Sequence, residues 1–168
     1  MTILTVLQHP DPRLRVKASP VVAIDESIRR IVADMYETMY DHRGVGLAAT
    51  QVGIHQRIFV MDVSETRDQR VCAINPEILT REGKQFEAEG CLSVGAGVYD
   101  KVERALRLRF RALDIHGKPY EMDAENLMAA CVQHEIDHLD GILFIHHLSR
   151  IKQERALKRI EKVQRRAL

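Results

Sequence analysis

The sequence predicts an α+β fold, with small antiparallel sheets around a central helix that carries two histidines and with one further helix near each end. Three observations favour this class. Apolar residues recur at helical spacing in one segment near each end of the chain, two histidines four residues apart indicate a helix between those segments, and several short β-rich runs are separated by glycine, proline or polar residues. A chain of 168 residues suits one core, so we expect a single domain over residues 1–168.

The composition excludes disordered and fibrous proteins, because 45% of the residues are hydrophobic and 29% are charged. The three cysteines do not follow a disulfide-framework pattern, which favours a reducing compartment and leaves at least one thiol free. The N-terminus has the pattern of neither a secretory signal nor a transit segment, and no apolar run could span a membrane. These features predict a cytoplasmic protein without membrane contact.

The first helix is predicted over residues 26–42. Asp25 can cap its N-terminus, and a basic last turn is followed by a stop at Gly44. Its inward face would consist of apolar residues at helical spacing, namely Ile28, Ile31, Val32, Met35 and Met39.

Residues 44–53 (GVGLAATQVG) have little side-chain bulk, which lets their backbone approach a neighbouring group closely. The glycine spacing does not match a nucleotide-binding loop, and the segment follows a helix instead of preceding one. Gln51 carries the only side-chain amide in the segment. It is either a hydrogen-bond donor beside a site or a satisfied structural residue, and the pattern does not separate the two.

Strands are predicted over residues 57–63, 71–75, 105–112 and 120–123. Pro76 is expected to end the second of them. Residues 78–80 and 85–88 flank Gly83 and are expected to pair with each other. Residues 105–112 alternate apolar with basic side chains, which is typical of a half-buried strand.

Residues 149–168 are predicted to form one helix with a narrow apolar stripe of Leu157, Ile160, Val163 and Ala167. The stretch contains eight Lys or Arg against two Glu, so its formal charge is +6, while the preceding 148 residues carry −5 from 17 basic and 22 acidic residues. Such a tail favours a polyanionic partner. A solvated outer helix explains the same charge equally well.

The most informative stretch is residues 133–139 (QHEIDHL). On a helix, His134 and His138 lie one turn apart on the same face, so both imidazoles can bind one metal ion. Glu135 stands at the edge of that site, where it can accept a proton from water. The apolar residues before the motif argue against a solvated surface helix. The motif therefore predicts a metal-dependent hydrolase.

A hydrolytic centre of this kind needs a third protein ligand. Asp140 and the histidine pair at 146–147 follow the motif, but neither has the usual spacing of a metalloprotease ligand. Cys91 is the better candidate, because it lies in a tight Gly-Cys-Leu-Ser segment at the end of a predicted strand. Cys72 and Cys131 lie among apolar residues and are more simply explained as core or pocket-wall residues.

Three motifs together resemble the peptide deformylase family: residues 44–51 (GVGLAATQ), 89–93 (EGCLS) and 133–138 (QHEIDH), in that order. The segment VLQHPDPRLR near the start and a C-terminal helix also match the family pattern, so the resemblance covers nearly the whole chain. It implies a compact α+β enzyme that removes the formyl group from the N-formylmethionine end of new polypeptides. N-formylmethionyl peptides would then be its partners.

The resemblance also implies roles for individual residues. The ligands of one divalent metal would be Cys91, His134 and His138, with Fe²⁺ in the cell and Zn²⁺, Ni²⁺ or Co²⁺ as alternatives. Glu135 would act as the base, while the Gln51 side chain and the Leu92 backbone N–H would stabilise charge on the formyl oxygen. The substrate would lie against Val45, Gly46, Phe86, Leu127 and Cys131, the last three around its methionine. The C-terminal helix would hold the enzyme at the ribosome, without sequence-specific nucleic-acid recognition.

One segment departs from the family pattern. In the family, EGCLS is followed within a few residues by a proline and often by an arginine, whereas residues 94–99 of this chain read VGAGVY. The two glycines predict a more mobile rim of the substrate cleft.

The residues leave two other functions open. A peptidase could use the same helix to cut internal bonds, since both reactions attack an amide carbonyl. A catalytically silent metal-binding module, docked on the ribosome through the basic tail, is the other alternative. The presence of Glu135 argues against it.

Overall fold

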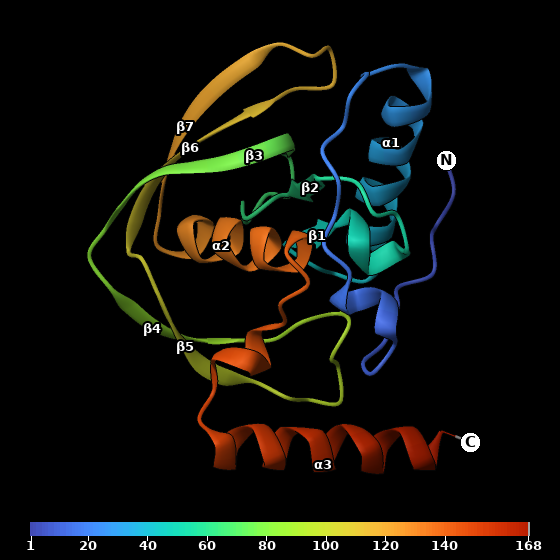
Figure 1. The fold of residues 1–168 in the computed structure, drawn as a ribbon, viewed down its shortest axis with the longest axis vertical. Helices are drawn as coiled ribbons and strands as arrows, with labels where there is room; N and C mark the ends of the chain where they lie inside the picture. The colour runs from blue at the N-terminus through green and yellow to red at the C-terminus, as the bar shows by residue number, and fades with distance from the viewer. Residues whose placement is uncertain (168) are drawn as a thin grey trace.

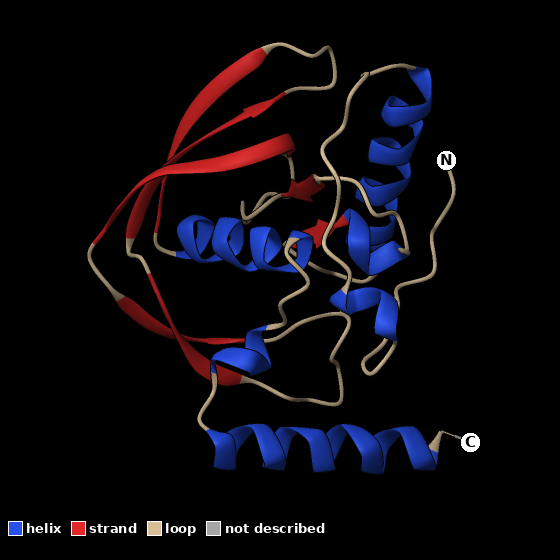
Figure 2. Ribbon diagram, in the orientation of Figure 1, coloured by secondary structure: helices blue, strands red, loops and turns tan. Residues whose placement is uncertain are grey.

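The computed structural model describes residues 1–167, and within them it contains two antiparallel sheets and three α-helices (Figures 1 and 2). The elements in chain order are α1 (Glu26–Asp41), β1 (Gly46–Ala48), β2 (Ile58–Met61), β3 (Val71–Glu82), β4 (Gln85–Glu89), β5 (Asp100–Arg104), β6 (Arg107–Leu113), β7 (Pro119–Glu125), α2 (Leu127–Leu139) and α3 (Arg150–Arg166). One sheet has the order β1-β2-β3-β6-β7 and the other pairs β4 with β5. The predicted α+β class is confirmed, while Leu168, the last residue of the predicted domain and helix, lies outside the described residues.

α2 lies at the centre of the molecule, between the five-stranded sheet and the β4–β5 pair (Figure 1). Its apolar side, which includes Ala129 and Val132, packs against Phe59 and Phe110 of the larger sheet. The helix is buried on more than one side, because the second sheet covers the face that carries the charged residues. This central placement is the one that the sequence predicts for the helix with the two histidines.

α1 is an amphipathic helix on the far side of the larger sheet. Asp25 caps it, since its Oδ1 accepts the Ile28 N–H at 3.1 Å, and Met35 and Met39 are fully buried against β1 and β2. The predicted span of 26–42 is confirmed to within one residue, because His42 is the C-cap.

The prediction that Pro76 ends the second strand is wrong, because β3 continues to Glu82. The register of its pairing with β6 shifts between Ile74 and Glu77, so Pro76 occupies a bulge where a backbone donor is not needed. Asn75 has a φ of +51° there. Its side chain exchanges two hydrogen bonds with the backbone of Val21, at 2.8 and 2.9 Å, which holds the bulge in place.

The predicted pairing of residues 78–80 with 85–88 is wrong. The end of β3 pairs with β6, and β4 pairs with β5 in the other sheet. Gly83, with a φ of +66°, turns the chain from one sheet into the next instead of closing a hairpin. This sharp exit carries the chain around α2 to its opposite side (Figure 1).

α3 lies along the outside of the molecule, below the β4–β5 pair in Figure 1. Ala156 and Ile160 are its buried residues, whereas Leu157 and Val163 of the predicted stripe are 39% and 42% exposed. The buried face of α3 therefore differs from the predicted stripe and consists of Ala156 and Ile160, which lie one helical turn apart. The small side chain of Ala156 lets the helix approach the rest of the protein closely. Among residues 1–167, no helix is both long and apolar enough to cross a membrane.

Candidate metal centre

Three side chains from two distant parts of the chain converge beside α2. The donor atoms of Cys91, His134 and His138 all lie within 4.8 Å of one another. Cys91 Sγ and His134 Nε2 are each 3.2 Å from His138 Nε2. Such separations are close to the edge of a tetrahedron, roughly 3.3 Å, that metal–nitrogen bonds of about 2.0–2.1 Å define. One sulfur and two imidazole nitrogens can therefore share a single ion.

The electrostatics of the three groups fit a divalent metal. Burial lowers the pKa of His138 well below its usual value, so its ring is neutral and offers a lone pair. Burial alone would also lower the pKa of His134, but its hydrogen bonds with Cys91 and Glu89 and the nearby Glu135 raise it. The site is mostly buried, and its two ring nitrogens and one sulfur face one another, so a cation is needed between them. A thiolate with two imidazoles suits the softer divalent metals.

Glu135 lies against the same group and is almost completely buried, at 3% exposure. Its Oε2 has no hydrogen-bond partner among the described residues, and burial raises the pKa of the carboxyl to about 7. Gly46 makes this position available. A Cβ at Gly46 would lie 2.6 Å from Glu135 Oε1 and 2.8 Å from Cys131 Sγ, so only glycine lets β1 approach α2 this closely.

Two hydrogen-bond donors stand beside the ligand group. The Ala48 N–H donates to Gln51 Oε1 at 2.9 Å, which turns the amide nitrogen of Gln51 toward Ser93 Oγ (3.1 Å) and Cys91 Sγ (3.7 Å). The backbone N–H of Leu92, directly after Cys91, donates to no protein acceptor within residues 1–167. Gln51 is thus both a structural residue of the 3-10 helix Ala49–Val52 and a donor at the site, which unites the two interpretations left open by the sequence.

A cavity of about 430 Å³ opens onto the centre. Predicted site residues that line it are Val45, Gly46, Gln51, Cys91, Leu92, Leu127, Cys131, His134 and Glu135. Phe86 does not line it, although it was predicted as a wall of the methionine pocket. It shares a face of β4 with the lining residue Ala88, but it lies one pleat further along the strand and is 55% exposed. A separate depression of about 500 Å³ over β3, β6 and β7 is lined by none of the metal-binding residues.

The other two cysteines are not part of the ligand group. Burial raises the pKa of Cys72 to about 12 and that of Cys131 well above its usual value, so both stay neutral thiols. Cys131 lines the cavity and Cys72 lies in β3, as expected for wall and core residues. Among residues 1–167, Cys91 is the cysteine that meets the two imidazoles.

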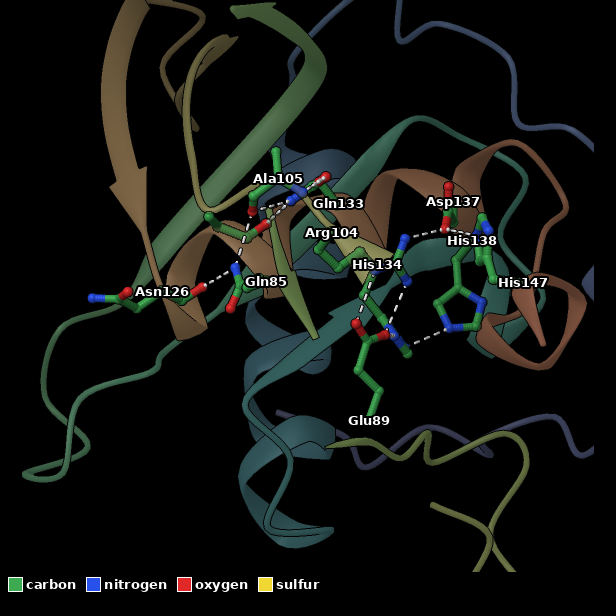
Figure 3. Close-up of polar contacts among 11 residues, drawn as sticks. Gln85, Glu89, Arg104, Ala105, Asn126, Gln133, His134, Asp137, His138 and His147 are labelled. Atoms are coloured by element: carbon green, nitrogen blue, oxygen red, sulfur yellow. Dashed lines mark hydrogen bonds and ion pairs between the residues drawn. The ribbon is translucent and has the colours of Figure 1, made fainter. Parts of the chain in front are cut away.

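An ionic network supports the centre, and it includes residues that the sequence did not single out (Figure 3). Glu89 Oε1 is 2.9 Å from His134 Nδ1 and also accepts a bond from Arg104. Arg104 binds Glu89 through Nε and Nη2 at 2.8 and 2.9 Å and Asp137 through Nη1 at 2.7 Å. His147 Nε2 completes the chain at 2.8 Å from Asp137. The network joins the β4–β5 pair to the helix that carries both histidines.

The charge state of Glu89 orients His134. Burial alone would raise the pKa of Glu89, but the bonds from Arg104 and His134 lower it to about 2. The ionised carboxylate therefore accepts a hydrogen bond from the Nδ1–H of His134. The Nε2 atom of the same ring is then free to face Cys91 Sγ and His138 Nε2. Glu89 lies inside a recognisable motif, but Arg104 ends the highly charged run DKVER at residues 100–104, which has the composition of a solvated segment. No local signal distinguishes this buried arginine from its exposed neighbours.

A helix that presents two histidines and a buried carboxylate, completed by a cysteine and open to a cleft, defines a metal-dependent hydrolase. A family model described as polypeptide deformylase matches residues 3–154. The peptide deformylase of Alkalilimnicola ehrlichii is 57% identical over 166 residues, which cover 98% of this chain and 93% of that protein. The peptide deformylase of Stutzerimonas stutzeri is 52% identical over 167 residues, which cover 98% of each chain.

Solved structures agree with these sequence matches. The crystal structure of a peptide deformylase from Legionella pneumophila has a TM-score of 0.94 at 45% identity, and the match covers 98% of this chain and 96% of the other. The peptide deformylase of Ehrlichia chaffeensis in complex with actinonin has a TM-score of 0.93 at 40% identity, covering 98% and 99%. The chain belongs to the polypeptide deformylase family. It is a metal-dependent hydrolase that removes the N-formyl group from newly made polypeptides and releases formate, which confirms the resemblance drawn from the three motifs.

Replacing Arg104 with alanine should lower the free energy of unfolding by about 3–5 kcal/mol, because it leaves Glu89 and Asp137, whose side chains are 11% and 20% exposed, without their shared cation. Chemical denaturation at matched metal loading measures this change. Arg107→Ala is the matched control, since it removes an exposed ion pair with Glu82 at 3.6 Å and should change stability little. Equal losses in the two variants would contradict the assignment of Arg104 as the buried link.

Proposed function

We propose that Cys91, His134 and His138 hold one divalent metal at the floor of the cleft, Fe²⁺ in the cell. The observation that carries this proposal is the convergence of their three donor atoms beside the unpartnered carboxylate oxygen of Glu135. Zn²⁺, Ni²⁺ and Co²⁺ suit the same thiolate and imidazole donors, so metal availability decides which of the four is bound.

The chain's own residues then share the work of hydrolysis. A divalent cation bound there would lower the pKa of water and polarise the formyl carbonyl. Glu135 accepts the proton of the attacking water and returns it to the departing amine, so that the formamide C–N bond breaks into formate and a free amino group. The Gln51 side-chain amide and the Leu92 N–H donate to the formyl oxygen as negative charge develops on it.

The cleft supports an extended peptide with an N-terminal methionine. β1 is an edge strand of the five-stranded sheet, and Val45 and Gly46 at its start line the cavity, so the substrate backbone can run alongside them. Leu127 and Cys131 provide an apolar wall for the methionine side chain. Phe86, which lies outside the cavity lining, is left out of this pocket.

Glu135→Gln tests the proposed base. We expect formate release from formyl-Met peptides to fall by about 10²- to 10⁴-fold, because a carboxamide cannot take up the proton of water. The metal content should stay at one ion per chain, since the ligands are untouched. The matched control is Glu87→Gln, an exposed residue of β4 that does not line the cavity.

The same assay separates the alternative functions. A protein that cleaves acetylated or internal peptide bonds but not formyl-Met peptides would be a peptidase. Full cellular function of a metal-loaded Glu135→Ala variant would indicate a silent metal-binding module. The first result would contradict the deformylase activity, and the second would contradict the proposed role of Glu135.

The identity of the metal can be tested by its sensitivity to air. Protein purified without oxygen should contain Fe²⁺, and this form should lose formate-releasing activity in air through oxidation of the iron or of Cys91. Protein reloaded with Ni²⁺ or Co²⁺ should keep its activity over the same exposure. Metal analysis and timed assays measure both, and equal air stability of the iron and nickel forms would count against the proposal.

We further propose that the enzyme works in the cytoplasm and meets its substrate at the ribosome through α3. Three free cysteines and a substrate found on newly made chains support the location. The exposed side of α3 carries Arg155, Lys158 and Lys162, which are well placed to contact ribosomal phosphates.

Changing Arg155, Lys158 and Lys162 together to glutamate should weaken binding to purified ribosomes and reduce its dependence on salt, because fewer counterions are then released. Formate release from a short peptide should stay unchanged. The control reverses the same number of charges at Arg81, Lys84 and Lys118, which are exposed elsewhere. Co-sedimentation over a range of salt concentrations measures both, and equal binding of the two triple variants would refute the role of α3.

A further inference from the structure

The rim of the cleft, residues 94–99, has an unusual backbone. Gly95, Ala96 and Gly97 have φ angles of +57°, +56° and +65°, so three consecutive residues lie in the left-handed region. Ala96 lacks the freedom of glycine in that region. Gly95 and Tyr99 line the cavity beside the metal centre. A neighbouring element must therefore hold this part of the cleft in its conformation.

α3 is that element. Arg159 Nε donates to the backbone carbonyl of Ala96 at 2.8 Å. The same guanidinium lies against Gly97, where an added Cβ would be 3.0 Å from Arg159 Nη2. At the far end of the rim, Lys152 Nζ is 3.0 Å from Asp100 Oδ1. α3 thus contacts the rim through one donor near its middle and one ion pair at its end.

Apolar contacts below the rim complete this attachment. Ala156 and Ile160 of α3 are buried in one cluster with Val94 and Val98. These two valines flank the left-handed residues, so the helix fixes the backbone on both sides of them. The sequence prediction of a mobile rim considered the glycines alone, and the contacts from α3 oppose that mobility.

The rim is joined directly to the ligand segment. The N–H groups of Val94 and Gly95 both donate to the carbonyl of Cys91, at 3.1 and 2.8 Å. The ring of Tyr99 lies so close to Gly90 that an added Cβ there would be 2.4 Å from the ring. A shift of the rim would therefore move two residues that line the cavity, next to the place where the substrate enters.

We propose that Arg159 is a positioning residue for substrate binding, which fixes the Gly95–Tyr99 side of the cleft through the carbonyl of Ala96. The proposal rests on the cleft being the peptide site. Arg159 is neither among the residues that line the cavity nor in the group of Cys91, His134 and His138, so its removal should weaken peptide binding without impairing the chemical step. Removal of a basic residue from the outer side of α3, which does not contact the rim, should not weaken peptide binding.

The experiment compares Arg159→Ala with Lys158→Ala, a control that removes one positive charge from the next residue of the same helix. For Arg159→Ala we expect the KM of a formyl-Met tripeptide to rise about three- to fivefold, the effect of losing one hydrogen bond, with kcat changed less than about twofold. Hydrogen exchange of the amides of residues 94–99 should become faster at the same time. Lys158→Ala should match the wild type in both measurements, and Arg159→Lys should lie between.

A folded, metal-loaded Arg159→Ala protein with wild-type KM and wild-type exchange of residues 94–99 would overturn the proposal. So would an equal rise of KM in Lys158→Ala, because that would show a general effect of charge. Should Arg159→Ala fail to fold or to hold metal, Arg159→Lys decides by the same two readouts, and wild-type values in it would overturn the proposal. The exchange measurement does not need turnover, so failure of the proposed function, seen as a wild type that releases no formate, is a separate result.

Discussion

The buried ion pairs of Arg104 are the interaction on which the metal centre depends. Glu89 precedes Cys91 by two residues in the chain, and Asp137 directly precedes His138. Each carboxylate thus belongs to a segment that carries a proposed metal ligand, and one guanidinium, 5% exposed at its side chain, binds both of them. The desolvation of a buried arginine is offset only when both carboxylates are in place. When Arg104 forms its ion pairs with both carboxylates, the segment with Cys91 therefore comes to lie beside the helix with the two histidines.

A second constraint acts from the opposite side of α2. β1 approaches the helix so closely that Gly46 has no room for a side chain, and this contact places the Glu135 carboxylate beside the three donors. The two sheets therefore contact different faces of one helix, with Cys91 in the loop after β4 and Gln51 in the 3-10 helix after β1. The cleft is the gap between the edge of one sheet and the rim that follows the other. The Ala48 N–H orients the Gln51 side chain and the Glu89 carboxylate orients His134, so these two groups need little rearrangement.

The parts of this arrangement that local patterns encode could be predicted, and the parts set by distant partners could not. Helical periodicity located α1, and the motif with His134 and His138 located α2 and indicated the shared face of the two histidines. Pairing of strands is not local, so no sequence pattern indicated that β3 continues past Pro76 through a bulge that the Asn75 side chain stabilises. The predicted stripe of α3 was right for Ile160 but included the exposed Leu157 and omitted the buried Ala156, because an amphipathic pattern does not say which residues contact the body of the protein. Arg104 was missed because its partners lie in two other elements.

The position of α3 explains how the chain tolerates glycines at the edge of its active site. The match to the family model ends at residue 154, so most of α3, including Arg159 and Ile160, lies beyond the part of the chain that the model matches. The rim with the sequence VGAGVY lies inside that part. Its two glycines alone would lose more entropy on ordering than other residues, which favours a loose cleft. A helix that binds the Ala96 carbonyl and buries Val94 and Val98 offsets that loss, so the contacts from α3 compensate for the glycines of the rim.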